Sequence, residues 1–334
     1  MKILHVTPHL GGGIGTVIMD WMDKVIAAND HYHRIVCLDY ANDKAKKWAE
    51  KKGFPLAENM GRYPLLWKHE IREADIVLTH YWNHPMLADL FADSIPDCRL
   101  VFWCHKNIVY PPKEIAYSDL FINTSPVQGH GRYIWSTGNM DRFLAIQPKI
   151  HRGFNVGYCG TVDYKKMHRS WIDMCKKINI PGITFTVLGD VGIDTTECDE
   201  RFRFVGKVDD VAPYLVEMDI FGYSLRPDHY GTCEIALGEA MAAGVVPVVM
   251  DNPAEKFIVT HGLPIARNEQ EFIDLVVFYY HCKNGDRHVA WEGMKERARN
   301  RAKKLYSIDN MIQQWDEIFA EMIQKPKTKK EVLK

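Results

Sequence analysis

The sequence of 334 residues lacks any apolar run approaching the roughly 20 residues that a membrane-spanning helix needs. It also lacks an excess of one charge, because 42 basic residues balance 43 acidic ones. This balance argues against a whole-molecule electrostatic grip on nucleic acid and leaves room only for a local basic patch. There is no short-period repeat, and the only biased segment is the lysine-rich C-terminal tail. We therefore expect a globular chain of two domains of ordinary size.

The eight cysteines form no C-x-x-C pair, and most of them lie within apolar runs. This usage is typical of reduced, mainly buried thiols rather than of a disulfide framework or a zinc site. Residues 2–7 read KILHVT, an apolar strand, so no signal peptide is expected at the N-terminus. These features predict a cytoplasmic protein.

The segment 219–251 predicts a strand, a polar loop, a helix and a second strand. We expect the helix over 233–243, with Thr232 as its N-cap. The apolar run 245–250 that follows is typical of a buried parallel strand. The helix would thus begin just beyond the carboxyl end of a strand, where open α/β sheets bind ligands.

The start of this helix combines groups that suit a sugar nucleotide. Free amides in the first turn, at Thr232, Cys233 and Ile235, carry partial positive charge that favours a phosphate. Glu234 and Glu239 add carboxylates, which accept hydrogen bonds from hydroxyl groups. We therefore expect amides and a cation to bind a diphosphate, and carboxylates to bind ribose and hexose hydroxyls.

The same segment resembles the signature of retaining glycosyltransferases of the GT-B fold, the group 1 class (family 4). That signature has two glutamates eight residues apart, the second within Glu-Ala-Met-Ala-x-Gly and followed by Pro-Val-Val. The chain has these sequences at 239–244 and 247–249, but Gly231 stands where the first glutamate is expected. The resemblance implies that Glu239 holds the nucleotide ribose. Glu234, three residues after Gly231, becomes a candidate catalytic residue, and whether it replaces the missing glutamate stays open.

The first strand runs into the glycine-rich segment 11–15, which precedes a helix. Glycines allow a close approach of the backbone to phosphate, which fits two kinds of site. One is a Rossmann dinucleotide site with Asp39 as the ribose acid, although Thr16 stands where the third glycine belongs. The other is implied by the resemblance, in which Gly12 and Gly13 face the donor phosphates and the acceptor. We favour the second because a second α/β domain follows.

Polar residues follow further strands of the first half, on the same expected rim of the sheet. The resemblance implies that His105, at a strand end, contacts the donor hexose as a catalytic residue. Candidate acceptor contacts on this rim are His80, Trp82 and Ser125. His80 and His84 have a spacing found in metal sites, but no third ligand accompanies them, so no metal is expected.

The second half opens with a strand and a glycine, after which relatives have Gly-Arg-Leu with a lysine five residues beyond the arginine. Lys166 matches that lysine, whereas Thr161 stands in place of the arginine. The resemblance implies that Lys166 neutralises the donor diphosphate and that another group must replace the lost charge. Farther along, Gly206, Lys207 and Val208 follow a short strand, at the position where relatives read the nucleotide base through the backbone.

These patterns predict an α/β protein of GT-B fold, with two Rossmann-like domains facing each other across a cleft. Residues 1–152 would form the acceptor domain and 153–308 the nucleotide-sugar domain. The helix 309–324 would either cross back onto the first domain or pack on its own, and 325–334 would be a disordered basic tail.

The expected activity is a retaining transfer of a hexose or pentose from a nucleotide diphosphate sugar. The resemblance favours a UDP-sugar, because uridine is the commoner nucleotide in the family. We expect no metal and no cofactor, because the nucleotide sugar is a substrate, and the acceptor is not identified. The first alternative is a glycosyltransferase acting on modified bases in DNA, which would use the basic tail and the aromatic residues Tyr81, Trp82, Trp103 and Tyr110.

Two further alternatives change the class of protein. One is a nucleotide-dependent oxidoreductase built on the glycine-rich segment. The other is a non-catalytic sugar-nucleotide-binding protein, for which the altered positions Gly231 and Thr161 argue. Contact of the lysine-rich tail with an anionic membrane surface is a further expectation.

Overall fold

The computed structural model describes residues 1–28, 31–92, 94–107, 116–129, 131–147, 149, 151–260 and 262–330. The chain forms two compact units. Unit 1 comprises Met1–Asn139, Gly231–Cys233 and Ile308–Lys334, and unit 2 comprises Met140–Tyr230 and Glu234–Ser307. The main division therefore falls at Asn139, upstream of the boundary expected near residue 152.

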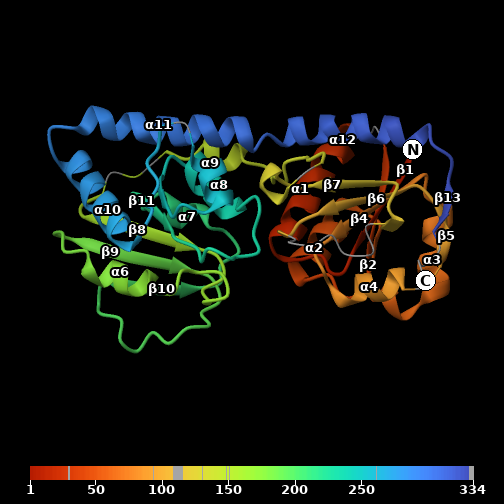
Figure 1. Cartoon of the computed structure of the whole chain (residues 1–334), viewed down its shortest axis with the longest axis horizontal. Helices are drawn as coiled ribbons and strands as arrows, with labels where there is room; N and C mark the ends of the chain where they lie inside the picture. The colour runs from red at the N-terminus through yellow and green to blue at the C-terminus, as the bar shows by residue number, and fades with distance from the viewer. Residues whose placement is uncertain are drawn as a thin grey trace. The chain divides into compact units, whose positions relative to one another are not determined.

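Unit 1 contains a six-stranded sheet of order β3-β2-β1-β4-β6-β7, and every neighbouring pair is parallel (Figure 1). Its strands are β1 (Lys2–Thr7), β2 (Tyr32–Cys37), β3 (Leu56–Ala57), β4 (Ile76–Tyr81), β6 (Leu100–Cys104) and β7 (Leu120–Asn123). Strand order reverses at β1, as in a doubly wound Rossmann sheet. The strands carry apolar side chains on both faces, as expected for a parallel sheet that is covered by helices on both sides.

The helices of unit 1 cover this sheet and bury their apolar faces against it. They are α1 (Gly12–Ala28), α2 (Asp43–Lys52), α3 (Pro64–Glu73), α4 (Pro85–Phe91) and α12 (Ile308–Ile323), with short 3₁₀ turns η1 (Met60–Arg62) and η3 (Pro126–Gln128). The glycine-rich segment is not a free loop as expected. Gly12 and Gly13 already form the first turn of α1, which the Thr16 hydroxyl supports by donating to the Gly12 carbonyl at 3.1 Å.

The last helix, α12, belongs to unit 1 although it follows unit 2 in the chain. Its apolar stripe is buried, and the fully buried Trp315 stacks on Trp21 of α1 at 5.5 Å between ring centroids. In Figure 1 this blue helix lies with the red and orange elements of unit 1. The C-terminal helix is thus part of the core of the unit that begins the chain.

The expectation of a disordered basic tail is wrong for the described residues 325–330. Strand β13 (Thr328–Lys330) pairs antiparallel with β5 (Ile95–Cys98), next to the main sheet. The Lys330 side chain is only 6% exposed, and its ammonium lies 2.5 Å from Asp119. Main-chain pairing and a buried ion pair order this segment, which its charge alone does not reveal. Residues 331–334 lie outside the described part of the chain.

Unit 2 contains a five-stranded parallel sheet of order β10-β9-β8-β11-β12. Its strands are β8 (Phe154–Cys159), β9 (Ile183–Leu188), β10 (Phe202–Gly206), β11 (Ile220–Tyr223) and β12 (Val246–Val249). Its helices are α5 (Asp141–Leu144), α6 (Trp171–Lys177), α7 (Ala212–Leu215), α8 (Ile235–Ala242), α9 (Pro253–Val259), α10 (Glu269–Asn284) and α11 (His288–Leu305). The two Rossmann-like sheets confirm the expected α/β class.

Helix α8 starts later than expected. Its first residue is Ile235, and Glu234 occupies the N-cap position in place of Thr232. The cap makes no side-chain hydrogen bond to the helix, because the Glu234 carboxylate is directed to other partners. Among the helices of the described residues, none is long and apolar enough to cross a membrane.

Candidate functional site

A buried ion pair joins two of the residues singled out in unit 2. The Lys166 ammonium follows β8 and lies 2.9 Å from Glu234 at the start of α8. Their side chains are 15% and 1% exposed. Both groups lie beyond the carboxyl ends of strands β8 and β11, the edge at which open parallel sheets bind ligands.

A tyrosine that terminates β11 completes the pair. The Tyr223 hydroxyl donates to the same Glu234 carboxylate oxygen at 2.5 Å, and the Lys166 ammonium lies 5.8 Å from the Tyr223 ring centroid. On the other side the ammonium lies 5.7 Å from the ring of Tyr230. The cation is therefore fixed by a carboxylate and bordered by two aromatic rings.

Electrostatics keep both members of the pair charged at neutral pH. Burial by itself lowers the pKa of Lys166, but the Glu234 carboxylate outweighs burial, so the pKa is raised. Burial likewise opposes ionisation of Glu234, and the charges of Lys166 and His229 lower its pKa instead. A fixed, partly exposed ammonium at a sheet edge is suited to binding an anion.

A histidine and a second carboxylate extend this network. His229 Nε2 lies 2.9 Å from Glu255, and His229 Nδ1 lies 3.6 Å from Glu234. The Asn252 amide donates to the other Glu255 oxygen at 2.9 Å. Burial lowers the pKa of His229, but its hydrogen bond and charge interaction with Glu255, together with Glu234, raise it overall.

The backbone at Glu234 is strained. Its φ of 36° and ψ of 67° lie in the left-handed region, where a non-glycine residue costs about 1–3 kcal/mol. The conformation directs the carboxylate into the buried cluster, where Lys166 and Tyr223 hold it. Strain retained at a charged residue on a ligand-binding edge is characteristic of a functional position.

Other donor-site candidates of unit 2 lie at the same edge. The Glu239 carboxylate, half-buried on α8, is close enough to Cys159 at the end of β8 to help burial raise the pKa of that thiol to about 12. Thr161 is exposed just beyond β8, and its carbonyl accepts a hydrogen bond from Tyr158 at 3.0 Å.

The base-reading candidates come at the end of β10. Gly206 ends the strand with a φ of 83°, and its carbonyl accepts from Gly189 at 2.9 Å. Lys207 is exposed and Val208 is half-buried. The structure thus gathers the candidates of unit 2 along one sheet edge, on the loops after β8, β10 and β11.

The unit 1 candidates fall into two groups, and the first lies at the carboxyl edge of its sheet. Gly12 and Gly13 are exposed, and a Cβ at either would meet no heavy atom within 4 Å. Trp82 is half-buried beyond β4, with its ring 5.2 Å from that of His9. His105 follows β6 and is also half-buried. These four residues keep surface available for a ligand.

The second group is occupied internally. Both ring nitrogens of the fully buried His80 are engaged by other histidines, so the prediction that His80 contacts an acceptor is wrong. The buried Ser125 hydroxyl caps η3 by accepting from the Val127 amide at 3.4 Å. Within unit 1 the hydroxyls of Thr232 and Thr124 lie 2.9 Å apart, and the Cys233 thiol donates to the Thr124 carbonyl at 3.1 Å.

Sequence reasoning missed three members of the unit 2 cluster: Tyr223, His229 and Glu255. A usable signal existed, because Tyr223 lies near the end of a predicted strand, His229 lies in the loop after it, and Glu255 comes shortly after the next predicted strand. Rules for parallel sheets place such residues at the ligand-binding edge. The sequence does not show which of these polar side chains point into the buried cluster.

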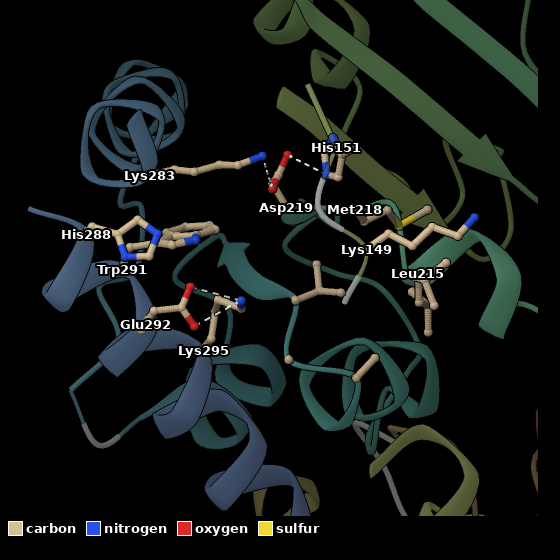
Figure 2. Close-up of a pocket in the computed structure, with 14 residues that line it drawn as sticks. Lys149, His151, Leu215, Met218, Asp219, Lys283, His288, Trp291, Glu292 and Lys295 are labelled. Atoms are coloured by element: carbon tan, nitrogen blue, oxygen red, sulfur yellow. Dashed lines mark hydrogen bonds and ion pairs between the residues drawn. The ribbon is translucent and has the colours of Figure 1, made fainter. Parts of the chain in front are cut away.

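A cavity of about 200 Å³ opens elsewhere in unit 2, at the amino-terminal ends of its strands (Figure 2). Several of its charged groups pair with one another. Asp219 lies 2.7 Å from Lys283 and 3.4 Å from His151, and Lys295 lies 3.1 Å from Glu292. None of the predicted donor residues lines this cavity, so it is not the predicted donor site.

One sequence match, in the second half of the chain, agrees with the fold. Residues 153–281 match the family model described as Glycosyl transferases group 1. The two Rossmann-like units confirm the expected GT-B fold, and the match over residues 153–281 supports the expected glycosyltransferase family and enzyme class. No curated protein matches the chain by sequence.

Solved structures share this fold at low sequence identity. A glycosyltransferase from Rickettsia africae ESF-5 superposes with a TM-score of 0.76 at 13% identity, covering 97% of this chain and 99% of that one. Anabaena Alr3699/HepE in complex with UDP and glucose gives 0.74 at 16%, covering 96% and 100%. The sucrose-phosphate synthase tll1590 from Thermosynechococcus elongatus gives 0.71 at 13%, covering 96% and 99%.

Proposed function

We propose that the protein is a retaining, metal-independent glycosyltransferase that takes its sugar from a nucleotide diphosphate sugar, most simply a UDP-sugar. The observation that carries this proposal is the Lys166–Glu234 pair, buried beside the first turn of α8 at the carboxyl edge of the unit 2 sheet. Anabaena HepE, which shares the fold, has been crystallised with UDP and glucose, and this supports UDP as the nucleotide.

In the proposed mechanism Lys166 and the first amides of α8 bind the diphosphate. Their positive charge stabilises the negative charge that develops on the leaving phosphate as the glycosidic bond breaks. Glu234 acts through Lys166 as a positioning residue, because its carboxylate is nearly inaccessible and holds the ammonium in one place. Glu239 would accept hydrogen bonds from the ribose hydroxyls, as the resemblance implies.

Retention of configuration follows, in this proposal, from a front-face transfer. The acceptor hydroxyl attacks from the side of the departing diphosphate, and a diphosphate oxygen accepts its proton. No protein nucleophile and no metal are required for this route. His105 would contact the donor hexose, and Gly12 and Gly13 would supply backbone contacts to the donor or acceptor.

The partners we propose are the donor and one acceptor of unidentified structure, with a cytoplasmic location that the eight free cysteines favour. The lysines of the C-terminal tail do not support binding to modified DNA or to a membrane surface. Lys325 and Lys330 have carboxylate partners, and Lys327 donates to the Arg72 carbonyl. Tyr110, which the DNA alternative also used, lies outside the described residues.

A thermal-shift screen with nucleotide sugars tests this function directly, because a ligand that binds only the folded protein raises its melting temperature. We expect UDP or a UDP-sugar to raise the Tm, and transfer to persist in EDTA with retained anomeric configuration by NMR of the product. Binding without donor hydrolysis or transfer would instead support the non-catalytic alternative. A shift with NAD and none with UDP-sugars would support the oxidoreductase.

Substitutions at the ion pair test the assigned site. Lys166→Met should abolish the shift, whereas Lys165→Met, at the exposed neighbouring lysine, should leave it unchanged. Because Lys166→Met leaves Glu234 buried and unpaired, it should also cost about 3–5 kcal/mol of stability. The double variant Lys166→Met/Glu234→Gln should recover most of that stability without recovering donor binding. An unchanged shift in a folded Lys166 variant would mean that the diphosphate binds elsewhere.

A further inference from the structure

Four histidines form a continuous hydrogen-bonded row across the unit 1 sheet. His33 Nδ1 lies 2.8 Å from His5 Nε2, His5 Nδ1 lies 3.1 Å from His80 Nε2, and His80 Nδ1 lies 3.1 Å from His105 Nε2. They come from β2, β1, β4 and the residue after β6, which are neighbours in the sheet. Ring centroids of successive members lie 5.1–5.4 Å apart.

The strand register produces this row. His5 pairs with Leu78 of β4, two residues before His80, and Trp103 of β6 pairs with His80, two residues before His105. Side chains two residues apart project from the same face of a sheet. Each histidine is therefore the diagonal neighbour of the next, and all four lie on one face.

The row runs from a buried end to an open end. His5, His33 and His80 are 0–4% exposed, whereas His105 is half-buried at the carboxyl edge. Burial, reinforced by the neighbouring histidines, lowers the pKa of His5 and of His80 well below its usual range. Burial also lowers the pKa of His33 and of His105 to about 3. At neutral pH each ring is thus neutral and carries a single N–H.

One N–H per ring allows only two arrangements of the row, because each ring must donate in the same direction as its neighbours. In the first, every N–H points toward His105, so His105 accepts at Nε2 and carries its own proton on Nδ1. In the second, every N–H points toward His33, so His33 carries its proton on Nε2.

The buried end decides between the two arrangements. His33 Nε2 is buried and has no hydrogen-bond partner in the part of the chain that the structure describes. The second arrangement would leave a buried N–H unpaired there, whereas the first leaves only an unpaired lone pair. Orphaned buried N–H groups are rarer in proteins than orphaned acceptors. The first arrangement is therefore favoured.

We propose that this row fixes His105 in its Nδ1–H tautomer, so that His105 presents a hydrogen-bond donor at the open edge. His80 is the positioning residue that acts through His105, and His5 and His33 continue the row behind it. A sugar hydroxyl oxygen can accept from this N–H. The tautomer stands on the geometry of unit 1 alone, whereas its use in binding the donor hexose rests on the proposed function.

NMR of histidine side-chain nitrogens in the ¹⁵N-labelled full chain at neutral pH measures this tautomer. We expect the His105 resonance, assigned by its loss in His105→Phe, to report Nδ1–H. In His80→Phe the donor to His105 Nε2 is lost, and the population should move toward Nε2–H. His80→Asn should retain Nδ1–H, because its amide can donate from about the position of the ring Nδ1.

His33→Phe is the matched control. It also replaces a buried histidine by an apolar ring, but it leaves His80 donating to His105, so the Nδ1–H tautomer should remain. Nε2–H in the wild-type chain would overturn the proposal, and so would an unchanged tautomer in folded His80→Phe.

Kinetics separate this inference from the proposed function. If the His105 N–H forms a hydrogen bond to the nucleotide sugar, His80→Phe should lower kcat/KM for that substrate about 3–10-fold, the effect of losing one hydrogen bond. In His33→Phe kcat/KM should stay near the wild-type value. If His80→Phe changes the tautomer but not kcat/KM, His105 does not contact the sugar as proposed, although the row still sets its tautomer.

Discussion

Lys166 and Glu234 contribute more to the stability of the fold as a pair than either charge would by itself. An isolated buried charge loses its hydration, and a pair recovers that loss only when the remaining hydrogen-bonding capacity is also satisfied. Tyr223 supplies such a bond to Glu234, and His229 adds positive charge on the other side. The cluster therefore keeps a lysine charged and stationary at the sheet edge, which suits the proposed binding of a diphosphate.

His229 gives this cluster a dependence on pH. Its pKa is raised above the ordinary 6.5, so its protonated form stabilises the folded state. That contribution is complete below the unfolded pKa and is lost as the pH rises through the folded one. We expect the free energy of unfolding to decline from about pH 6.5 upward, and His229→Gln to flatten this decline.

Urea unfolding across this pH range measures the effect. The groups that face His229 include Glu255, Glu234 and Lys166, and Glu234, whose pKa is lowered, keeps its negative charge throughout the range. If His229→Gln keeps the wild-type dependence of the free energy of unfolding on pH, another group is responsible for it.

At the scale of elements, α8 depends on a close approach to the last residues of unit 2. A Cβ at Gly238 would lie 2.5 Å from the Tyr306 ring, whose hydroxyl donates to the Glu234 carbonyl at 3.2 Å. Glycine at this position lets α8 sit against Tyr306, and this contact in turn supports the strained cap of the helix. The small residues of the helix are therefore required by packing.

The same substitution in two helices should have opposite effects on stability. Gly238→Ala overpacks the contact with Tyr306 and should cost about 1–3 kcal/mol. Gly293→Ala, in α11, meets only the Arg297 guanidinium at 3.7 Å and should stabilise the helix by about 0.5–1 kcal/mol. Urea unfolding of both variants tests this, and equal effects would contradict the packing argument.

At the scale of the whole molecule, unit 1 is built from both ends of the chain. Met1–Asn139 supplies the sheet, and Ile308–Lys334 supplies α12 and β13. The Trp315 ring lies 5.5 Å from Trp21 and 5.2 Å from Trp103, so α12 buries apolar surface that residues 1–139 alone would expose. The stability of the first unit thus depends on the last helix.

Trp315→Ala should therefore weaken unit 1 specifically. Loss of a fully buried tryptophan costs about 3–5 kcal/mol. By hydrogen–deuterium exchange we expect faster exchange in peptides from unit 1 and unchanged exchange in peptides from unit 2. Trp291→Ala, which removes a buried tryptophan of unit 2, should give the converse pattern. Faster exchange in both units from either variant would show that the units do not unfold separately.

The sequence by itself determined the class of the fold and most elements, because apolar runs bounded by glycines and polar residues require buried parallel strands. It also indicated that Lys166, Glu234 and Glu239 lie beyond a strand end or on the helix that follows one, since strand ends and helix starts are visible as local patterns. The start of α8, the ordered tail and the buried state of His80 were decided only by tertiary structure. Each depends on contacts between residues far apart in the chain, such as Lys330 with Asp119 or His80 with His5, and no local pattern encodes such pairings.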